Sequence, residues 1–300
     1  MRRERREAAR GRHARGGATD TVGPALDAAL ARGFDALAQL AIDGVQVSAR
    51  AVDLTTGAAL LSIDDHVAMP TAGIGKVLLL IEVAARLQQD ASYGLGLLER
   101  SAKDAVGGAG LWQHMLAPAL PVADLAALVG AGDNLATNVL LRSVGLDAVA
   151  RRGVALGLSR TALLDLVRDR RGPDDAPQLS VGSAAELAWL FAALARGEII
   201  APEVSQRVIS WLSLNTDLSM VASAFGLDPL AHRTAEHGIL LVNKTGADPG
   251  VHSEAGVLRG PRTGVAYAVS TYFREESLQL RLRILDGMRS VGADLLEYVH

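Results

Sequence analysis

The sequence contains no cysteine, which excludes disulfide bonds, catalytic thiolates and cysteine-ligated zinc sites. Its seven histidines show no ligand spacing such as H-E-x-x-H, so we expect neither a metal nor a cofactor. No apolar run reaches the roughly eighteen residues that a membrane span needs. The net charge of −3 gives no indication of a nucleic-acid-binding surface over the whole chain.

Residues 1–23 are rich in arginine and lack the apolar run that a secretory signal peptide requires. We therefore expect a cytoplasmic protein. A block of like charges most often forms a solvated, disordered tail, which is the interpretation we favour. The alternatives are an arm that binds nucleic acid or anionic lipid, or a start site assigned too far upstream.

Residues 24–300 have the patterns of a single globular domain, and 49% of the whole chain is hydrophobic. Apolar residues at three- and four-residue steps predict a helix from about residue 24, followed by a hairpin that turns at Thr55-Thr56-Gly57. Strand patterns return near residue 238 and end in a helix over about 276–299. We predict an α+β fold whose antiparallel sheet comes from both chain ends and is flanked by helices. The α/β lobe takes residues 24–75 and 236–300, and a mainly helical lobe takes residues 76–235.

A buried helix is predicted over residues 76–88, because its apolar residues surround the helix nearly completely. Lys76 begins this helix, where a charge is unexpected unless it is paired or functional. Thr71 precedes it and offers a hydroxyl for capping. A surface lysine that extends its ammonium to water is the alternative for Lys76.

Two further segments carry polar side chains at the ends of elements. Asp133 and Asn134 stand at a predicted helix start, where Asp133 is expected to have a structural role. Lys244 and Thr245 lie on a strand, where an ammonium and a hydroxyl facing a cleft would bind a carboxylate. An ordinary exposed lysine is the alternative for Lys244.

Together, Gly73-Ile74-Gly75-Lys76, Gly132-Asp133-Asn134 and Lys244-Thr245-Gly246 resemble the S-x-x-K, S-D-N and K-T-G motifs of class A serine β-lactamases and penicillin-binding proteins. The order and intervals of the segments fit this superfamily, and the resemblance covers residues 24–299. It implies a β-lactamase/transpeptidase-like fold and a serine hydrolase site for β-lactam or acyl-peptide amides.

The resemblance implies a role for each matching residue. Lys76 corresponds to the lysine that activates the serine, and Asn134 to the asparagine that binds the substrate's acyl-amide side chain. Lys244 and Thr245, followed by Gly246, correspond to the carboxylate-binding pair. The oxyanion hole is expected from the backbone amides of Gly73 and of the segment from Gly250 to His252.

Two catalytic hydroxyls of the superfamily are absent from this sequence. Gly73 stands at the nucleophile position and Gly132 at the position of the serine that passes a proton to the leaving nitrogen. Glycine has no heteroatom with which to attack an acyl carbon. The E-x-x-L-N segment that supplies the deacylating glutamate is also not recognisable, and only Asp165 and Asp169 lie near its place.

Three hypotheses remain from the sequence. The first is a catalytically impaired family member that binds a small or peptide-like ligand bearing a carboxylate. The second is a β-lactamase, amidase or esterase that uses another nucleophile, or an altered copy of an active parent with serine in place of Gly73. The third is a non-enzymatic interaction module.

Overall fold

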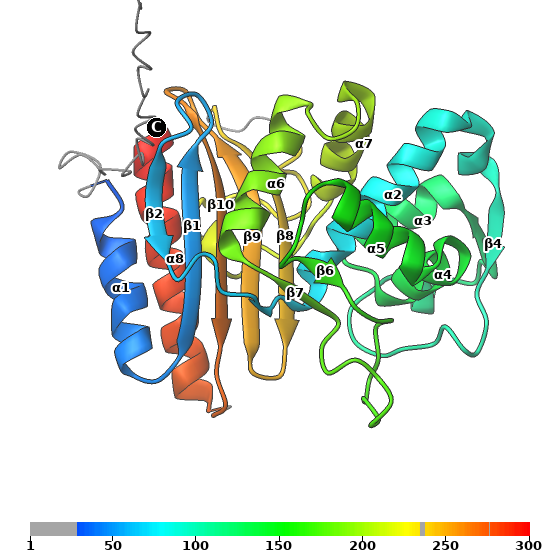
Figure 1. The fold of residues 1–300 in the computed structure, drawn as a ribbon, viewed down its shortest axis with the longest axis horizontal. Helices are drawn as coiled ribbons and strands as arrows, with labels where there is room; N and C mark the ends of the chain where they lie inside the picture. Colours follow the sequence, from blue (N-terminus) through cyan, green and yellow to red (C-terminus); the bar gives the residue numbers. More distant parts are fainter. Residues whose placement is uncertain (1–28, 235–237, 276) are drawn as a thin grey trace, which may run out of the picture.

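The computed structural model describes residues 29–234, 238–275 and 277–300 (Figure 1). The arginine-rich segment and the predicted start of the first helix lie outside these ranges. Among the described residues, no helix combines the length and the apolar character needed to cross a membrane.

A five-stranded antiparallel sheet joins the two ends of the chain in the order β2-β1-β10-β9-β8. Its strands are β1 (Gln46–Asp53), β2 (Ala59–Ile63), β8 (Leu240–Asp248), β9 (Val251–Arg259) and β10 (Gly264–Tyr272). The predicted α+β fold with a sheet from both chain ends is therefore confirmed. Within the sheet, β8 is an edge strand, so one side of it is open to other parts of the molecule.

The hairpin between β1 and β2 turns where the sequence predicts. Asp53 accepts hydrogen bonds from the backbone amides of Thr55 and Thr56 through its Oδ1. Gly57 follows with a φ of +73°, in the left-handed region that glycine adopts without strain.

Helices cover both faces of the sheet (Figure 1). The terminal helices α1 (Ala31–Ile42) and α8 (Leu278–Val299) pack together on one face, and α6 (Ala184–Arg196) packs against the other. Apolar side chains between the sheet and the terminal helices form one core cluster, and a second cluster fills the helical region and the α6 face.

The helical region surrounds α2 (Lys76–Gln89). Every side chain from Lys76 to Ala85 is buried, as the all-round apolar pattern predicts. The surrounding helices are α3 (Val122–Ala131), α4 (Asn134–Val144), α5 (Leu146–Ala155) and α7 (Pro202–Leu212). Short strands complete the region: β3 (Met69–Pro70), β4 (Leu97–Glu99), β5 (Ala119–Pro121), β6 (Ala162–Leu163) and β7 (Ser180–Gly182).

The start of α2 differs from the predicted cap. A short 3-10 helix, η1 (Ala72–Gly75), leads directly into α2, and the Thr71 side chain makes no capping hydrogen bond. Its hydroxyl instead lies 2.8 Å from the Ser180 hydroxyl on β7, and the Ser180 O–H donates a hydrogen bond to Ala72 O. Ala72 has a φ of +45°, so this segment is held in a conformation that alanine seldom adopts.

Candidate active site

A cleft of about 410 Å³ opens beside the edge strand β8. It lies where η1, the start of α2, the turn between α3 and α4, and β8 meet. The seven site residues predicted from the sequence all line it: Gly73, Lys76, Gly132, Asn134, Lys244, Thr245 and Gly246. The fold thus brings together three segments that are far apart in the chain.

Lys76 projects from the first turn of α2 and is only 3% exposed. Its Nζ donates a hydrogen bond of 2.7 Å to Asn134 Oδ1 at the start of α4. Burial, and secondarily the charge of Lys244, lower the pKa of Lys76 to about 7. A lysine with this pKa exists in both protonation states near neutral pH and is able to accept a proton.

Lys244 lies on β8 and is likewise 3% exposed. Its Nζ donates to Asn215 Oδ1 at 3.1 Å and to Thr245 O at 3.2 Å. Burial lowers the pKa of Lys244 to about 8, while the charges of Asp217 and Glu254 act in the opposite direction. Lys76, Lys244 and Arg168 share the lining of the cleft with the carboxylates of Asp169, Asp217 and Asp248, so the cleft carries charges of both signs.

A chain of buried hydrogen bonds connects Lys244 to a carboxylate inside the sheet. Asn215 Nδ2 donates to Asn243 Oδ1 at 3.0 Å, and Asn243 Nδ2 donates to Glu254 Oε1 at 2.8 Å. Tyr267 OH donates to the same Glu254 oxygen at 2.7 Å. Burial raises the pKa of Glu254 to about 7. We call Asn215, Asn243, Glu254 and Tyr267 the relay.

The relay was not identified from the sequence. The sequence nevertheless contains an indication of it, since Asn243 and Glu254 are polar residues in strands whose other residues are mainly apolar. Their partnership depends on strand register, because Asn243 pairs with Gly256 and Thr245 with Glu254 across the two strands.

Asp133 has the structural role predicted for it. It caps α4, where its Oδ1 accepts from Ala136 N at 2.9 Å and its Oδ2 from Trp112 N at 2.8 Å. This cap fixes the start of the helix that carries Asn134. Asn134 Nδ2 donates to Gly107 O at 3.3 Å. Gly107 lies on a loop that lines the cleft.

Gly73 lies against the backbone of β8. A Cβ atom built on Gly73 would be 2.8 Å from Thr245 O, closer than carbon side chains normally approach a carbonyl oxygen. A Cβ on Gly246 would be only 2.2 Å from Thr71 O. The two glycines therefore allow η1 and β8 to approach closely, and a side chain at either position requires one backbone to move.

Gly132 occupies a different environment. It ends α3 with a φ of +104°, a left-handed conformation common after the last helical residue. A Cβ built there would lie 3.9 Å from Lys244 Nζ, with no closer neighbour. Space is therefore present at residue 132, but a side chain would have to adopt a strained backbone conformation.

The two acids suggested near the deacylating position have separate surroundings. Asp165 accepts from Arg168 Nε at 2.9 Å and from Arg171 Nη1 at 2.6 Å, and it does not line the cleft. Asp169 lines the cleft and accepts from Gly107 N at 2.9 Å. Asp248, which the sequence analysis did not select, also lines the cleft, and burial raises its pKa.

One part of the predicted oxyanion hole is wrong. Gly250, in the turn after β8, and His252, on β9, line a second cavity rather than this cleft. The β8 residue that lines the cleft directly after Gly246 is Ala247.

The fold is similar to several solved β-lactamase structures. A beta-lactamase from Sphaerobacter thermophilus is 22% identical, with a TM-score of 0.77 over 90% of this chain and 97% of that chain. A beta lactamase from Xanthomonas campestris pv. campestris is 16% identical, with a TM-score of 0.74 over 90% and 98%. A PBP-A mutant, solved as an acyl-enzyme complex with penicillin G, is 16% identical, with a TM-score of 0.72 over 89% and 96%.

The sequence comparisons give a more specific result. None of the curated proteins compared with the chain matches it. The model of the beta-lactamase enzyme family, however, matches residues 29–299, which is nearly all of the described structure. The chain therefore belongs to the beta-lactamase enzyme family.

Proposed function

We propose that this chain is a non-acylating member of its family, which binds a β-lactam or acyl-peptide ligand through the ligand's carboxylate. The observation that carries the proposal is the environment of Gly73. Residue 73 lacks a nucleophile, and the carbonyl of Thr245 leaves no room there for the first carbon of a side chain. The absence of a hydroxyl and the lack of space for a side chain both support this proposal.

The ligand-binding side of the cleft supports the same proposal. Lys244 and the hydroxyl-bearing Thr245 line the cleft, and the relay holds Lys244 in place. An ammonium beside a hydroxyl is well suited to a carboxylate, which forms strong charge-assisted hydrogen bonds. Penicillin G is a suitable first ligand, because it carries both a carboxylate and an acylated β-lactam amide.

The test combines mass spectrometry with calorimetry. We expect penicillin G to add no mass to the protein and to bind reversibly. The Lys244→Ala variant should bind about tenfold more weakly or worse, since a charge-assisted contact is lost. Lys103→Ala is the matched control, because Lys103 is exposed and does not line the cleft. A covalent adduct on the wild-type protein, or unchanged affinity in Lys244→Ala, would contradict the proposal.

A second candidate is slow hydrolysis without an acyl-enzyme. It is favoured by the pKa of Lys76, which lies near 7 and leaves part of this residue neutral at neutral pH. A neutral lysine is able to take a proton from a water molecule that attacks the amide. Appearance of ring-opened penicillin that depends on Lys76, without a covalent intermediate, would favour this candidate. An interaction module is the remaining reading if no ligand of this class binds.

A further inference from the structure

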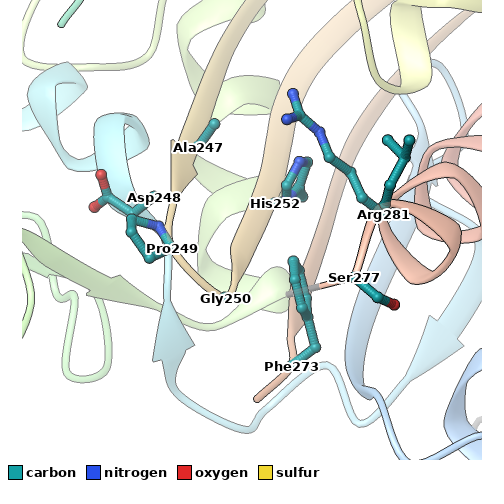
Figure 2. Close-up of a pocket in the computed structure, with 9 residues that line it drawn as sticks. Ala247, Asp248, Pro249, Gly250, His252, Phe273, Ser277 and Arg281 are labelled. Carbon is teal, nitrogen blue, oxygen red and sulfur yellow. The ribbon is translucent and has the colours of Figure 1, made fainter. Parts of the chain in front are cut away.

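A second cavity, of about 460 Å³, adjoins the cleft beyond the end of β8 (Figure 2). Its walls come from the turn between β8 and β9, the segment after β10 and the first turn of α8. Ala247, Asp248 and Pro249 line both this cavity and the cleft. The two hollows therefore meet along this segment of the chain.

His252 is the buried polar group of this cavity. It is 7% exposed, and its Nδ1 has no hydrogen-bond partner among the described residues. Figure 2 shows its imidazole beside the cavity with Phe273 and Arg281, and the rings of His252 and Phe273 lie 5.5 Å apart. A buried polar atom without a partner is costly, and Nδ1 itself has almost no accessible surface.

One basic and one acidic side chain, Arg281 and Asp248, line the cavity. Arg281 lies in the first turn of α8, which contains no acidic residue, and it forms no ion pair within the described part of the chain. A cation near the amino end of a helix is unfavourable unless an anion is also present. The Asp248 carboxylate points away from His252 and Arg281 (Figure 2), and Glu275 does not line the cavity.

The surroundings of His252 favour its neutral form, which is still able to donate a hydrogen bond. Burial and, secondarily, the charge of Arg281 lower the pKa of His252, while Asp217 acts in the opposite direction. A neutral imidazole keeps one N–H group, which donates to an oxygen anion without adding a second buried charge.

We propose that this cavity binds an anionic group, a carboxylate or a phosphate, through Arg281, His252 and the amino end of α8. Because the cavity shares a wall with the cleft, a ligand held by its carboxylate at Lys244 places a second acidic group here. This last step rests on the proposed function and narrows the ligand class to compounds with two anionic groups.

The cavity is tested first with inorganic phosphate alone, followed by NMR of the His252 ring. Wild-type protein should give a saturable shift, and Arg281→Gln should weaken binding about tenfold, as expected for loss of a charged contact. Arg283→Gln is the matched control, since Arg283 lies on the same helix and pairs with Asp43. Absence of saturation, or loss of the response in Lys244→Ala, would overturn the inference.

The extended ligand is tested with two peptides, N-acetyl-alanyl-glutamine and N-acetyl-alanyl-glutamate, which differ only in the amide or carboxylate at the end of the side chain. The glutamate peptide should bind wild-type protein about tenfold more tightly, and this advantage should disappear in Arg281→Gln. Equal affinities for wild-type protein would overturn the two-anion ligand. If neither peptide binds, the proposed function fails, while the phosphate titration still decides whether the cavity binds anions.

Discussion

Gly73 lies in close contact with the backbone of a neighbouring strand. With no Cβ at this position, the backbone of β8 lies where a side chain would begin. A serine restored here would therefore have to displace Thr245 O before it reached Lys76. Adding a hydroxyl at residue 73 is therefore not sufficient to restore a nucleophile there, because the backbone contact must also change.

We expect Gly73→Ser and Gly73→Ala to destabilise the protein equally, each by about 1–3 kcal/mol, because both add the same Cβ to a closely packed site. Chemical denaturation of the two variants measures this directly. The alanine variant is the matched control, since it adds the carbon without the hydroxyl. A serine variant as stable as the wild type would show that β8 moves aside at little cost.

The two buried lysines make ligand binding depend on pH. Lys76 and Lys244 lose their protons near pH 7 and pH 8, so the affinity for penicillin G should fall as pH rises through this range. Calorimetry between about pH 6 and pH 9 measures the change, and Lys244→Ala should remove the part of it near pH 8. Affinity that rises with pH would contradict the assignment.

These lysines also affect stability, with a sign that follows from their lowered pKa values. Above a pH of about 7, the unfolded chain holds the proton of Lys76 more tightly than the folded protein, up to the ordinary lysine value of 10.5. The free energy of unfolding should therefore increase as the pH rises from about 7 to about 10.5. In Lys76→Met that contribution should be absent.

At the scale of elements, the relay couples β8 to β9. Glu254 contributes a charge that raises the pKa of Lys244, and it reaches Lys244 through Asn243 and Asn215. The carboxylate thus supports the ligand-binding lysine without facing the cleft.

We expect Glu254→Gln to lower the pKa of Lys244 below its present value of about 8, because the supporting charge is removed. The pH midpoint of penicillin G binding should move down by the same amount. Tyr267→Phe should move the midpoint in the same direction but less far, since it keeps the carboxyl group and removes only a hydrogen bond that favours its charged form. An unchanged midpoint in Glu254→Gln would show that the relay does not influence the pKa of Lys244.

The sequence predicted most elements around the site but not their contacts. The buried helix at residue 76, the hairpin at Gly57 and the cap at Asp133 depend on local patterns, and all three are present. The relay and the clash at Gly73 depend on the register of β8 against β9 and η1, which a local pattern does not encode. The prediction that Thr71 caps the helix was wrong, because its hydroxyl hydrogen-bonds to Ser180, a residue distant in the sequence.

Helix α8 offers a test of how closely the terminal elements pack. A Cβ on Gly292 would lie 2.1 Å from Val221 O, a backbone atom, whereas the nearest atom to a Cβ on Gly287 would be the end of the Leu40 side chain at 2.8 Å. Gly292→Ala should therefore cost about 1–3 kcal/mol of unfolding free energy. Gly287→Ala should be neutral or slightly stabilising, because alanine favours a helix by about 1 kcal/mol over glycine.

At the scale of the whole molecule, ligand binding and stability are linked. The helical region lies beside the β8 edge of the sheet (Figure 1). The cleft is lined by residues of both parts, so a bound ligand contacts both of them. Any ligand that binds only the folded state stabilises the whole protein by mass action. When free ligand is removed, this stabilisation disappears if binding is reversible and persists if the ligand is covalently bound.

We expect penicillin G at about one hundred times its dissociation constant to raise the free energy of unfolding by about 2.7 kcal/mol. The melting temperature should rise by roughly 5 °C and return to its starting value after dialysis, because no acyl bond forms. Lys244→Ala, at the same ligand concentration, should show a smaller rise. A stabilisation that survives dialysis would instead require a nucleophile other than residue 73, which peptide mapping of the dialysed protein would locate.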